Sequence, residues 1–176
     1  MQQIGQILEL LYFFFSNFYF DVLSILLKSY GAIPLKRDQA DLTAFRLILQ
    51  YLSKPKGTMV IFPEGHRSKG NMLKAKTGIA KIALHSKATL IPVSITGTHH
   101  LKSVIRVLKP SGTITITCGK PFILKEGLSN YKKTDLEGIT SEIMFRIANL
   151  LPDNYRGFYR GNNKTKFIFT KELNTN

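Results

Sequence analysis

Apolar residues recur at helical spacing in three stretches of the chain. The first follows Asp41, which is a suitable N-cap, and continues to about Ser53. The same spacing returns over residues 75–86 and over residues 135–150. These patterns predict three helices, of which the last closes the domain.

Other segments have the spacing of strands. Residues 58–62 and 89–96 are short apolar runs, and residues 113–118 alternate between threonine and isoleucine before Cys118. Pro92 cannot donate to a ladder, so its strand is expected to lie at an edge or to contain a bulge. Strands that alternate with helices predict an α/β fold, a mixed sheet flanked by helices in a sandwich.

The first thirty residues differ in composition from the rest. Residues 4–27 are densely apolar, but two carboxylates interrupt them and leave an uncharged stretch shorter than the roughly 20 residues of a spanning helix. They predict one or two helices that lie in a membrane interface or cover the sheet. The expected organisation is an apolar segment (1–30), an α/β domain (31–160) and a basic polar tail (161–176).

The charge is strongly positive and unevenly distributed. The chain has 25 lysines and arginines against 11 carboxylates, a net charge of +14, and residues 1–30 contribute none of this excess. A basic body beside an apolar segment favours an anionic membrane surface, at the cytoplasmic face, as partner. Nucleic acid would suit the charge too, but it is the weaker interpretation, because neither a stacking platform nor a helix-turn-helix is evident.

Cysteine and histidine give no sign of a disulfide or a metal site. Cys118 is the single cysteine, so no internal disulfide can form, and its place in a strand predicts a packed residue and not a nucleophile. His99 and His100 have no cysteine or carboxylate partners nearby in the sequence, which favours a loop or a helix start over a metal site.

An anion site is predicted where the apolar run 58–62 ends. Pro63 and Gly65 force a turn, so the residues that follow project beyond the strand end, the edge at which open α/β sheets bind ligands. Arg67 offers a fork of donors suited to phosphate, lysines follow it closely, and Glu64 is placed to orient the arginine or accept a substrate hydroxyl. The alternative is a solvent-exposed loop without a ligand, in which the charged residues only keep the loop soluble.

Three ordered segments resemble the glycerolipid acyltransferases, in particular the bacterial 1-acyl-glycerol-3-phosphate acyltransferases. They are Gly-Ala-Ile-Pro-Leu-Lys-Arg at 31–37, Phe-Pro-Glu-Gly-His-Arg-Ser at 62–68 and Leu-Ile-Pro-Val-Ser-Ile at 90–95. They are similar to the second, third and fourth sequence blocks of that family, although His66 stands where threonine is more usual. The segment Leu-Pro-Asp-Asn-Tyr-Arg-Gly at 151–157 also resembles bacterial members.

The resemblance implies a fold, a reaction and a set of substrate-binding residues. The fold would be a glycerol-3-phosphate acyltransferase-like sandwich, and the reaction acyl transfer from acyl-CoA or acyl carrier protein to a lysophospholipid acceptor, 1-acyl-glycerol-3-phosphate. No metal or bound cofactor is expected, because a thioester is already activated. Headgroup ligands would be Arg37, Glu64, Gly65, Arg67 and Ser68, with the two arginines converging on the phosphate, and Pro92 and Val93 would line the acyl side.

The sequence departs from the family in one important respect. The first family block is a histidine followed five residues later by an aspartate, in which the imidazole acts as base and the carboxylate orients it. None of the four histidines here has that partner, so no catalytic residue is assigned. We interpret the chain as N-terminally incomplete. The alternative is an inactive, membrane-associated remnant that still binds anionic lipid.

Overall fold

The structure is a computed structural model that describes residues 31–33, 41–66, 68, 70–98, 112–128, 131–161 and 166–174. By its internal contacts the chain divides into two compact units, Met1–Ile48 and Leu49–Asn176, and each is considered by itself. The apolar segment 1–30, expected to form one or two helices, lies outside the described residues.

Helix α2 (Leu42–Leu52) begins where the sequence predicts a cap. The Ala44 backbone N–H donates to the Asp41 carboxylate at 3.0 Å, which satisfies one of the otherwise unpaired donors at a helix start. Ala44 and Ile48, four residues apart, are the buried residues of this helix. The predicted helix from Asp41 to about Ser53 is therefore confirmed.

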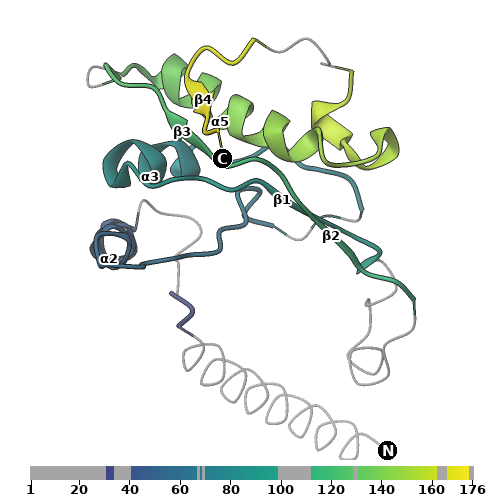
Figure 1. Cartoon of the computed structure of the whole chain (residues 1–176), viewed down its shortest axis with the longest axis horizontal. Helices are drawn as coiled ribbons and strands as arrows, with labels where there is room; N and C mark the ends of the chain where they lie inside the picture. The colour runs from purple at the N-terminus through teal and green to yellow at the C-terminus, as the bar shows by residue number, and fades with distance from the viewer. Residues whose placement is uncertain are drawn as a thin grey trace, which may run out of the picture. The chain divides into compact units, whose positions relative to one another are not determined.

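Helices α3 (Gly78–Ser86) and α5 (Lys133–Ala148) pack against each other in the second unit, as Figure 1 shows. The Asp135 carboxylate accepts the Lys132 N–H at 2.7 Å and so caps the start of α5. Between the two helices lies the main core, which also includes one strand residue. It consists of Ile79, Ala80, Ala83, Phe122, Leu136, Ile139 and Ile143.

The strands of the described chain form two antiparallel ladders. Strand β1 (Val93–Thr96) pairs with β2 (Thr115–Cys118), and β3 (Phe122–Leu124) pairs with β4 (Thr170–Glu172). Figure 1 shows β4, near the C-terminus, beside β3 and α5. The strand predicted at 113–118 is confirmed, whereas nothing in the sequence pattern predicted β4.

A bulge joins the two ladders opposite Pro92, but it lies in the partner segment and not in the strand of the proline, where it was expected. Val93 pairs with Cys118 and Leu90 bridges Phe122, so the β2–β3 side carries one more residue than its partner between these pairs. Pro92 contributes only its carbonyl, which accepts the Gly119 N–H at 2.8 Å. The ladder therefore needs no backbone N–H from residue 92, the group that proline lacks.

Two predictions for strand residues are wrong. Residues 58–62 are not a strand: no ladder includes them, and Val60 and Phe62 are 79% and 72% exposed. Their β-branched and apolar composition favours an extended chain, but a strand also needs a neighbour to bond with. Cys118 is exposed and not packed, because all four residues of β2 are exposed, on both faces of the strand.

The architecture is compatible with an α/β class, since helices pack on small antiparallel sheets. The mixed sheet and the complete sandwich stay predictions. No helix among the described residues has both the length and the apolar character needed to cross a bilayer.

Candidate functional site

The predicted turn after residues 58–62 is present and is closed by the backbone. The Gly65 N–H donates to the Phe62 carbonyl at 3.1 Å, and Gly65 has a φ of +70°, a conformation that glycine adopts without the strain felt by other residues. Glu64 lies at the third position of this turn and is half-buried. The turn therefore sets the direction in which the carboxylate points.

Two hydrogen bonds tie the far end of the loop back to this turn. The Glu64 Oε2 atom accepts the Leu73 N–H at 2.7 Å, and the Pro63 carbonyl accepts the Lys76 N–H at 3.0 Å. A Cβ atom on Gly65 would lie 3.4 Å from the aliphatic carbons of Lys76, so the lysine chain runs across the glycine. The loop 63–76 is thus closed around Glu64, with a lysine beside the turn.

Burial dominates the electrostatics of Glu64. Desolvation raises the pKa of its carboxyl above the usual glutamate value, and the hydrogen bond from the Leu73 N–H opposes this by lowering the pKa. Among the described residues, the other carboxylate oxygen has no hydrogen-bond partner. A half-buried carboxylate with one oxygen fixed and the other oxygen open is suited to accept a hydroxyl hydrogen bond from a polyol.

The raised pKa of Glu64 predicts a particular dependence of stability on pH. The folded chain holds this proton more tightly than the unfolded chain, so the free energy of unfolding falls as pH rises from about 4 through the raised folded pKa. Glu64→Gln lacks this loss. Urea unfolding at several pH values should show the variant gaining stability relative to the original chain as pH rises. A difference that is constant with pH would contradict the prediction.

The C-terminal part of the chain supports the loop from its other side. The Met72 N–H donates to the Tyr155 carbonyl at 2.9 Å, and the Met72 carbonyl accepts the Phe158 N–H at 3.0 Å. Three residues further on, the Ala75 N–H donates to the Tyr159 hydroxyl oxygen at 3.0 Å in a buried hydrogen bond. Residues 72–76 are therefore held between the Glu64 turn and residues 155–159.

Tyr159 is the buried centre of this support. Desolvation raises the pKa of its hydroxyl, the Ala75 N–H lowers it, and the nearby negative charge of Glu64 raises it further. The phenol therefore keeps its proton at neutral pH while its oxygen accepts the amide hydrogen bond. The Phe145 ring packs edge-on against Tyr159, with the ring centroids 5.3 Å apart.

Arg156 shapes the segment that carries Tyr159. Two short 3-10 helices, η2 (Asp153–Tyr155) and η3 (Gly157–Tyr159), follow α5. Between them, the Arg156 Nε atom donates to the Leu151 carbonyl at 2.9 Å, and its Nη1 atom contacts the Asp153 carboxylate at 2.9 Å. The family-like segment 151–157 thus folds into a brace for the loop, a role that its sequence alone did not indicate.

The structure describes only part of the predicted headgroup site. Glu64 and Gly65 form the turn, and Ser68 is half-buried in the same loop. Arg37 and Arg67 lie outside the described residues, so their convergence on one phosphate stays a prediction. His99 and His100 also lie outside the described residues, so their expected place in a loop or at a helix start stays a prediction.

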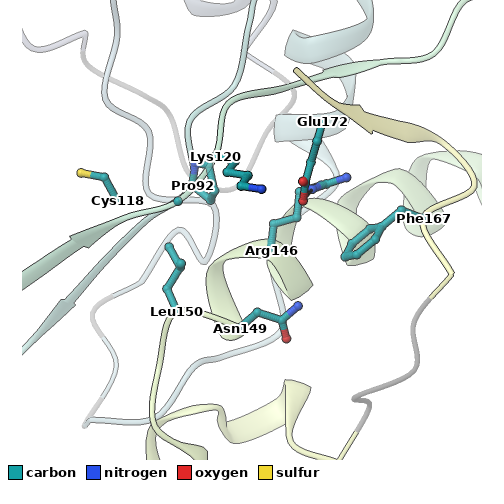
Figure 2. Close-up of a pocket in the computed structure, with 9 residues that line it drawn as sticks. Pro92, Cys118, Lys120, Arg146, Asn149, Leu150, Phe167 and Glu172 are labelled. Carbon is teal, nitrogen blue, oxygen red and sulfur yellow. Dashed lines mark hydrogen bonds and ion pairs between the residues drawn. The ribbon is translucent and has the colours of Figure 1, made fainter. Parts of the chain in front are cut away.

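The two residues predicted for the acyl side occupy different surfaces. Pro92 is buried and lines a cavity of about 310 Å³, whereas the next residue, Val93, is 40% exposed on the outer side of β1. The cavity is also lined by Lys120, Arg146, Asn149 and Glu172, and Figure 2 shows Lys120 directed toward Arg146 and Glu172. Apolar residues, among them Leu150 and Phe167, line the rest of the cavity.

Comparison with known proteins places the three resembling segments in one family. The family profile described as Acyltransferase matches residues 12–96, a span that includes all three. A 1-acyl-sn-glycerol-3-phosphate acyltransferase of Streptococcus pneumoniae (strain ATCC BAA-255 / R6) is 28% identical over 126 residues, which is 72% of this chain and 42% of the relative. One of Cocos nucifera, with the same name, is 32% identical over 74 residues, which is 42% of this chain and 24% of the relative.

The chain therefore spans less than half the length of these curated relatives. No solved structure gives a significant match. The profile match and the two relatives agree with the order of the three sequence segments, and together they support the assignment of the chain to the glycerolipid acyltransferase family.

Proposed function

We propose that this protein contributes to the transfer of a fatty acyl group from acyl-CoA or acyl carrier protein to the free hydroxyl of 1-acyl-glycerol-3-phosphate, giving phosphatidic acid. In this reaction the hydroxyl oxygen attacks the thioester carbonyl carbon. An ester C–O bond forms, the C–S bond breaks, and the hydroxyl proton ends on the departing thiol. The names of both curated relatives support this acceptor.

The observation that carries the proposal is the fixed geometry of Glu64. Its Oε2 atom is held by the Leu73 N–H at 2.7 Å, and its turn is held by the backbone on both sides. A carboxylate fixed in this way positions a hydroxyl acceptor without losing side-chain freedom on binding. Gly65, at the same turn, has no side chain and so lets the acceptor approach the backbone.

The cationic groups of the loop would hold the phosphate. Lys76 is exposed and lies beside Gly65 of the turn, and Lys74 is exposed with its ammonium over the Phe158 ring. We assign Arg67 and Arg37 to the phosphate oxygens by family resemblance. Glu64 would then bind the glycerol hydroxyl end and the cations the phosphate end. Opposite charges at the two ends give the acceptor one orientation.

The proton acceptor must be tested separately, because residues 1–176 contain no histidine followed five residues later by aspartate. Two proteins would be purified, this chain and a form extended by the upstream coding sequence. Each would be mixed with 1-acyl-glycerol-3-phosphate and acyl-CoA, and phosphatidic acid and free thiol would be measured. Transfer by either protein supports the proposal, and transfer by neither contradicts it.

The second candidate is a lipid-binding remnant without transfer activity, and the absent histidine–aspartate pair is what favours it. The same assay separates the two candidates when acceptor binding is measured in parallel. Binding of a short-chain 1-acyl-glycerol-3-phosphate, without product from either protein, supports the remnant.

We expect Arg67→Ala to weaken acceptor binding about 10- to 100-fold, since a lost charge-assisted hydrogen bond costs roughly 1.5 to 3 kcal/mol. Donor binding should stay unchanged, because the assigned role of Arg67 is on the acceptor phosphate. Titration calorimetry with the short-chain acceptor and with acyl-CoA would measure both.

Lys81→Ala is the matched control for Arg67→Ala, since Lys81 is an exposed cation on α3 and its loss changes the net charge equally. Equal weakening of acceptor and donor binding in Arg67→Ala would remove the assigned role.

A further inference from the structure

The cavity beside the end of α5 has a lining that is partly charged and partly apolar. Its polar residues include Lys120, Arg146, Asn149 and Glu172, and its apolar residues are Pro92, Leu150 and Phe167. The volume of about 310 Å³ is at the lower end of the range found for small-molecule sites. All of the lining residues belong to the second unit, and none comes from the loop 63–76 that carries Glu64. The cavity is therefore a candidate for a separate site.

Arg146 is the buried charged residue of this cavity. It is 7% exposed, and its guanidinium is fixed over the rings of Phe122 and Phe167. An arginine side chain has five N–H donors. Three of them are used, because the Nε and Nη2 atoms donate to the Thr170 hydroxyl and the Nη1 atom donates to Glu172. The other two donors, one on each Nη atom, have no acceptor among the described residues, and an unpaired buried donor is costly.

Lys120 brings a second positive charge to the same cavity. Its side chain is directed toward Arg146 and Glu172 (Figure 2), and its ammonium has no hydrogen bond or ion pair within the part of the chain that the structure describes. Glu172 offsets one of the two cations, so the lysine, arginine and glutamate of the lining have a net charge of +1. Ammonium and guanidinium donors favour anionic oxygen atoms. One negative charge on a ligand would therefore balance the cavity.

The apolar part of the lining distinguishes an organic anion from a free ion. Pro92 is buried, and Leu150 and Phe167 are half-buried. Water or an inorganic anion could accept the two unused Arg146 donors, but it would gain nothing from the apolar residues. An anion that carries an apolar body would also remove their surface from water, which is favourable.

We infer that this cavity binds a small organic anion of charge −1, which has one carboxylate or phosphodiester group held by Arg146 and Lys120 and an apolar body against the three apolar residues. The inference concerns a second site and does not depend on the proposed acyl transfer. Arg146 also bonds Thr170 and Glu172 of β4. A ligand that binds the guanidinium should therefore also stabilise β4.

The test uses the full chain and four probes in titration calorimetry. Hexanoate has the charge and the apolar body, acetate has the charge with almost no body, 1-hexanol has the body without charge, and diethyl phosphate replaces the carboxylate by a phosphodiester. We expect hexanoate or diethyl phosphate to bind at least about tenfold more tightly than acetate and 1-hexanol, because apolar burial adds to the charge-assisted hydrogen bonds. The tighter of the two identifies the anionic group. Its binding should also slow hydrogen exchange at the amides of residues 170–172.

Lys120→Glu changes the net charge of the lining from +1 to −1 and should weaken hexanoate binding at least about tenfold. Lys171→Glu is the matched control, because Lys171 is exposed, follows Thr170 in β4 and projects to the opposite side of the ladder from Glu172. It changes the net charge of the chain equally and should leave binding unchanged. Urea unfolding would show that both variants are folded.

Three results would overturn the inference. The first is that neither hexanoate nor diethyl phosphate binds the original chain, and the second is that acetate binds as tightly as hexanoate. The third is that Lys120→Glu weakens hexanoate binding no more than Lys171→Glu does. The calorimetry and the exchange measurement on the original chain need no variant, so they test the inference even where a substitution impairs folding.

Discussion

Replacement of Glu142 by alanine is expected to lower the free energy of unfolding by about 3 kcal/mol, because it leaves several buried donors unpaired and each unpaired donor costs roughly 1 to 3 kcal/mol. Glu142 lies in the middle of α5 and is only 4% exposed. Its carboxylate accepts the backbone N–H groups of Ile168, Phe169 and Thr170 and also the Thr170 hydroxyl. A single side chain thus anchors the segment that enters β4.

The effect is large because the network continues beyond Glu142. The Thr170 hydroxyl oxygen accepts the Arg146 Nε and Nη2 atoms at 3.1 and 2.9 Å, and the Arg146 Nη1 atom contacts Glu172 at 2.9 Å. The Arg146 guanidinium lies over the rings of Phe122 and Phe167, with distances of 4.6 and 4.1 Å to the ring centroids. Alanine would leave buried donors unpaired and Arg146 with less negative charge nearby.

Glu137→Ala is the control, because Glu137 lies on the same helix and is exposed, so its loss should change stability by no more than about 0.5 kcal/mol. Urea unfolding would measure both variants. Hydrogen exchange should also accelerate at the amides of residues 168–170 more than at those of β1. A loss below about 1 kcal/mol for Glu142→Ala would show that water replaces the carboxylate at little cost.

Features determined by neighbouring residues were predictable from the sequence. The Asp41 cap acts within one helical turn, and the alternation of residues 113–118 is a property of a single strand. Helix α3 begins at Gly78, three residues later than predicted, because the backbone of residues 72–76 bonds to the Glu64 turn and to residues 155–159 instead. Local pattern cannot anticipate such a competing partner.

Features that depend on distant pairing were missed for the same reason. Residues 58–62 have strand composition but no neighbour in the described chain, and β4 has little apolar character yet pairs with β3. At the site, Pro63, Glu64 and Gly65 were found because the turn is local. Tyr159 was missed because its contact with Ala75 joins residues 84 positions apart, and its only signal was the family-like segment just before it.

Gly157→Ala is expected to lower the free energy of unfolding by about 3 kcal/mol, because two penalties add. Gly157 has a φ of +46°, which costs a residue with a Cβ roughly 1 to 2 kcal/mol. A Cβ at this position would also overlap the Met72 carbonyl oxygen, and relieving such an overlap by backbone movement costs roughly 1 to 3 kcal/mol. Urea unfolding would measure the loss.

Gly127→Ala separates these two penalties, since Gly127 has a φ of +88° and a Cβ there would meet nothing within 4 Å. It should cost only the backbone strain. The overlap in Gly157→Ala pushes Met72 away and loosens the support of the Glu64 turn. The Leu73 amide should therefore exchange faster with solvent. Acceptor binding should also weaken under conditions where the variant is folded. Equal losses of stability in the two variants, with acceptor binding unchanged, would mean that residues 155–159 do not hold the carboxylate in place.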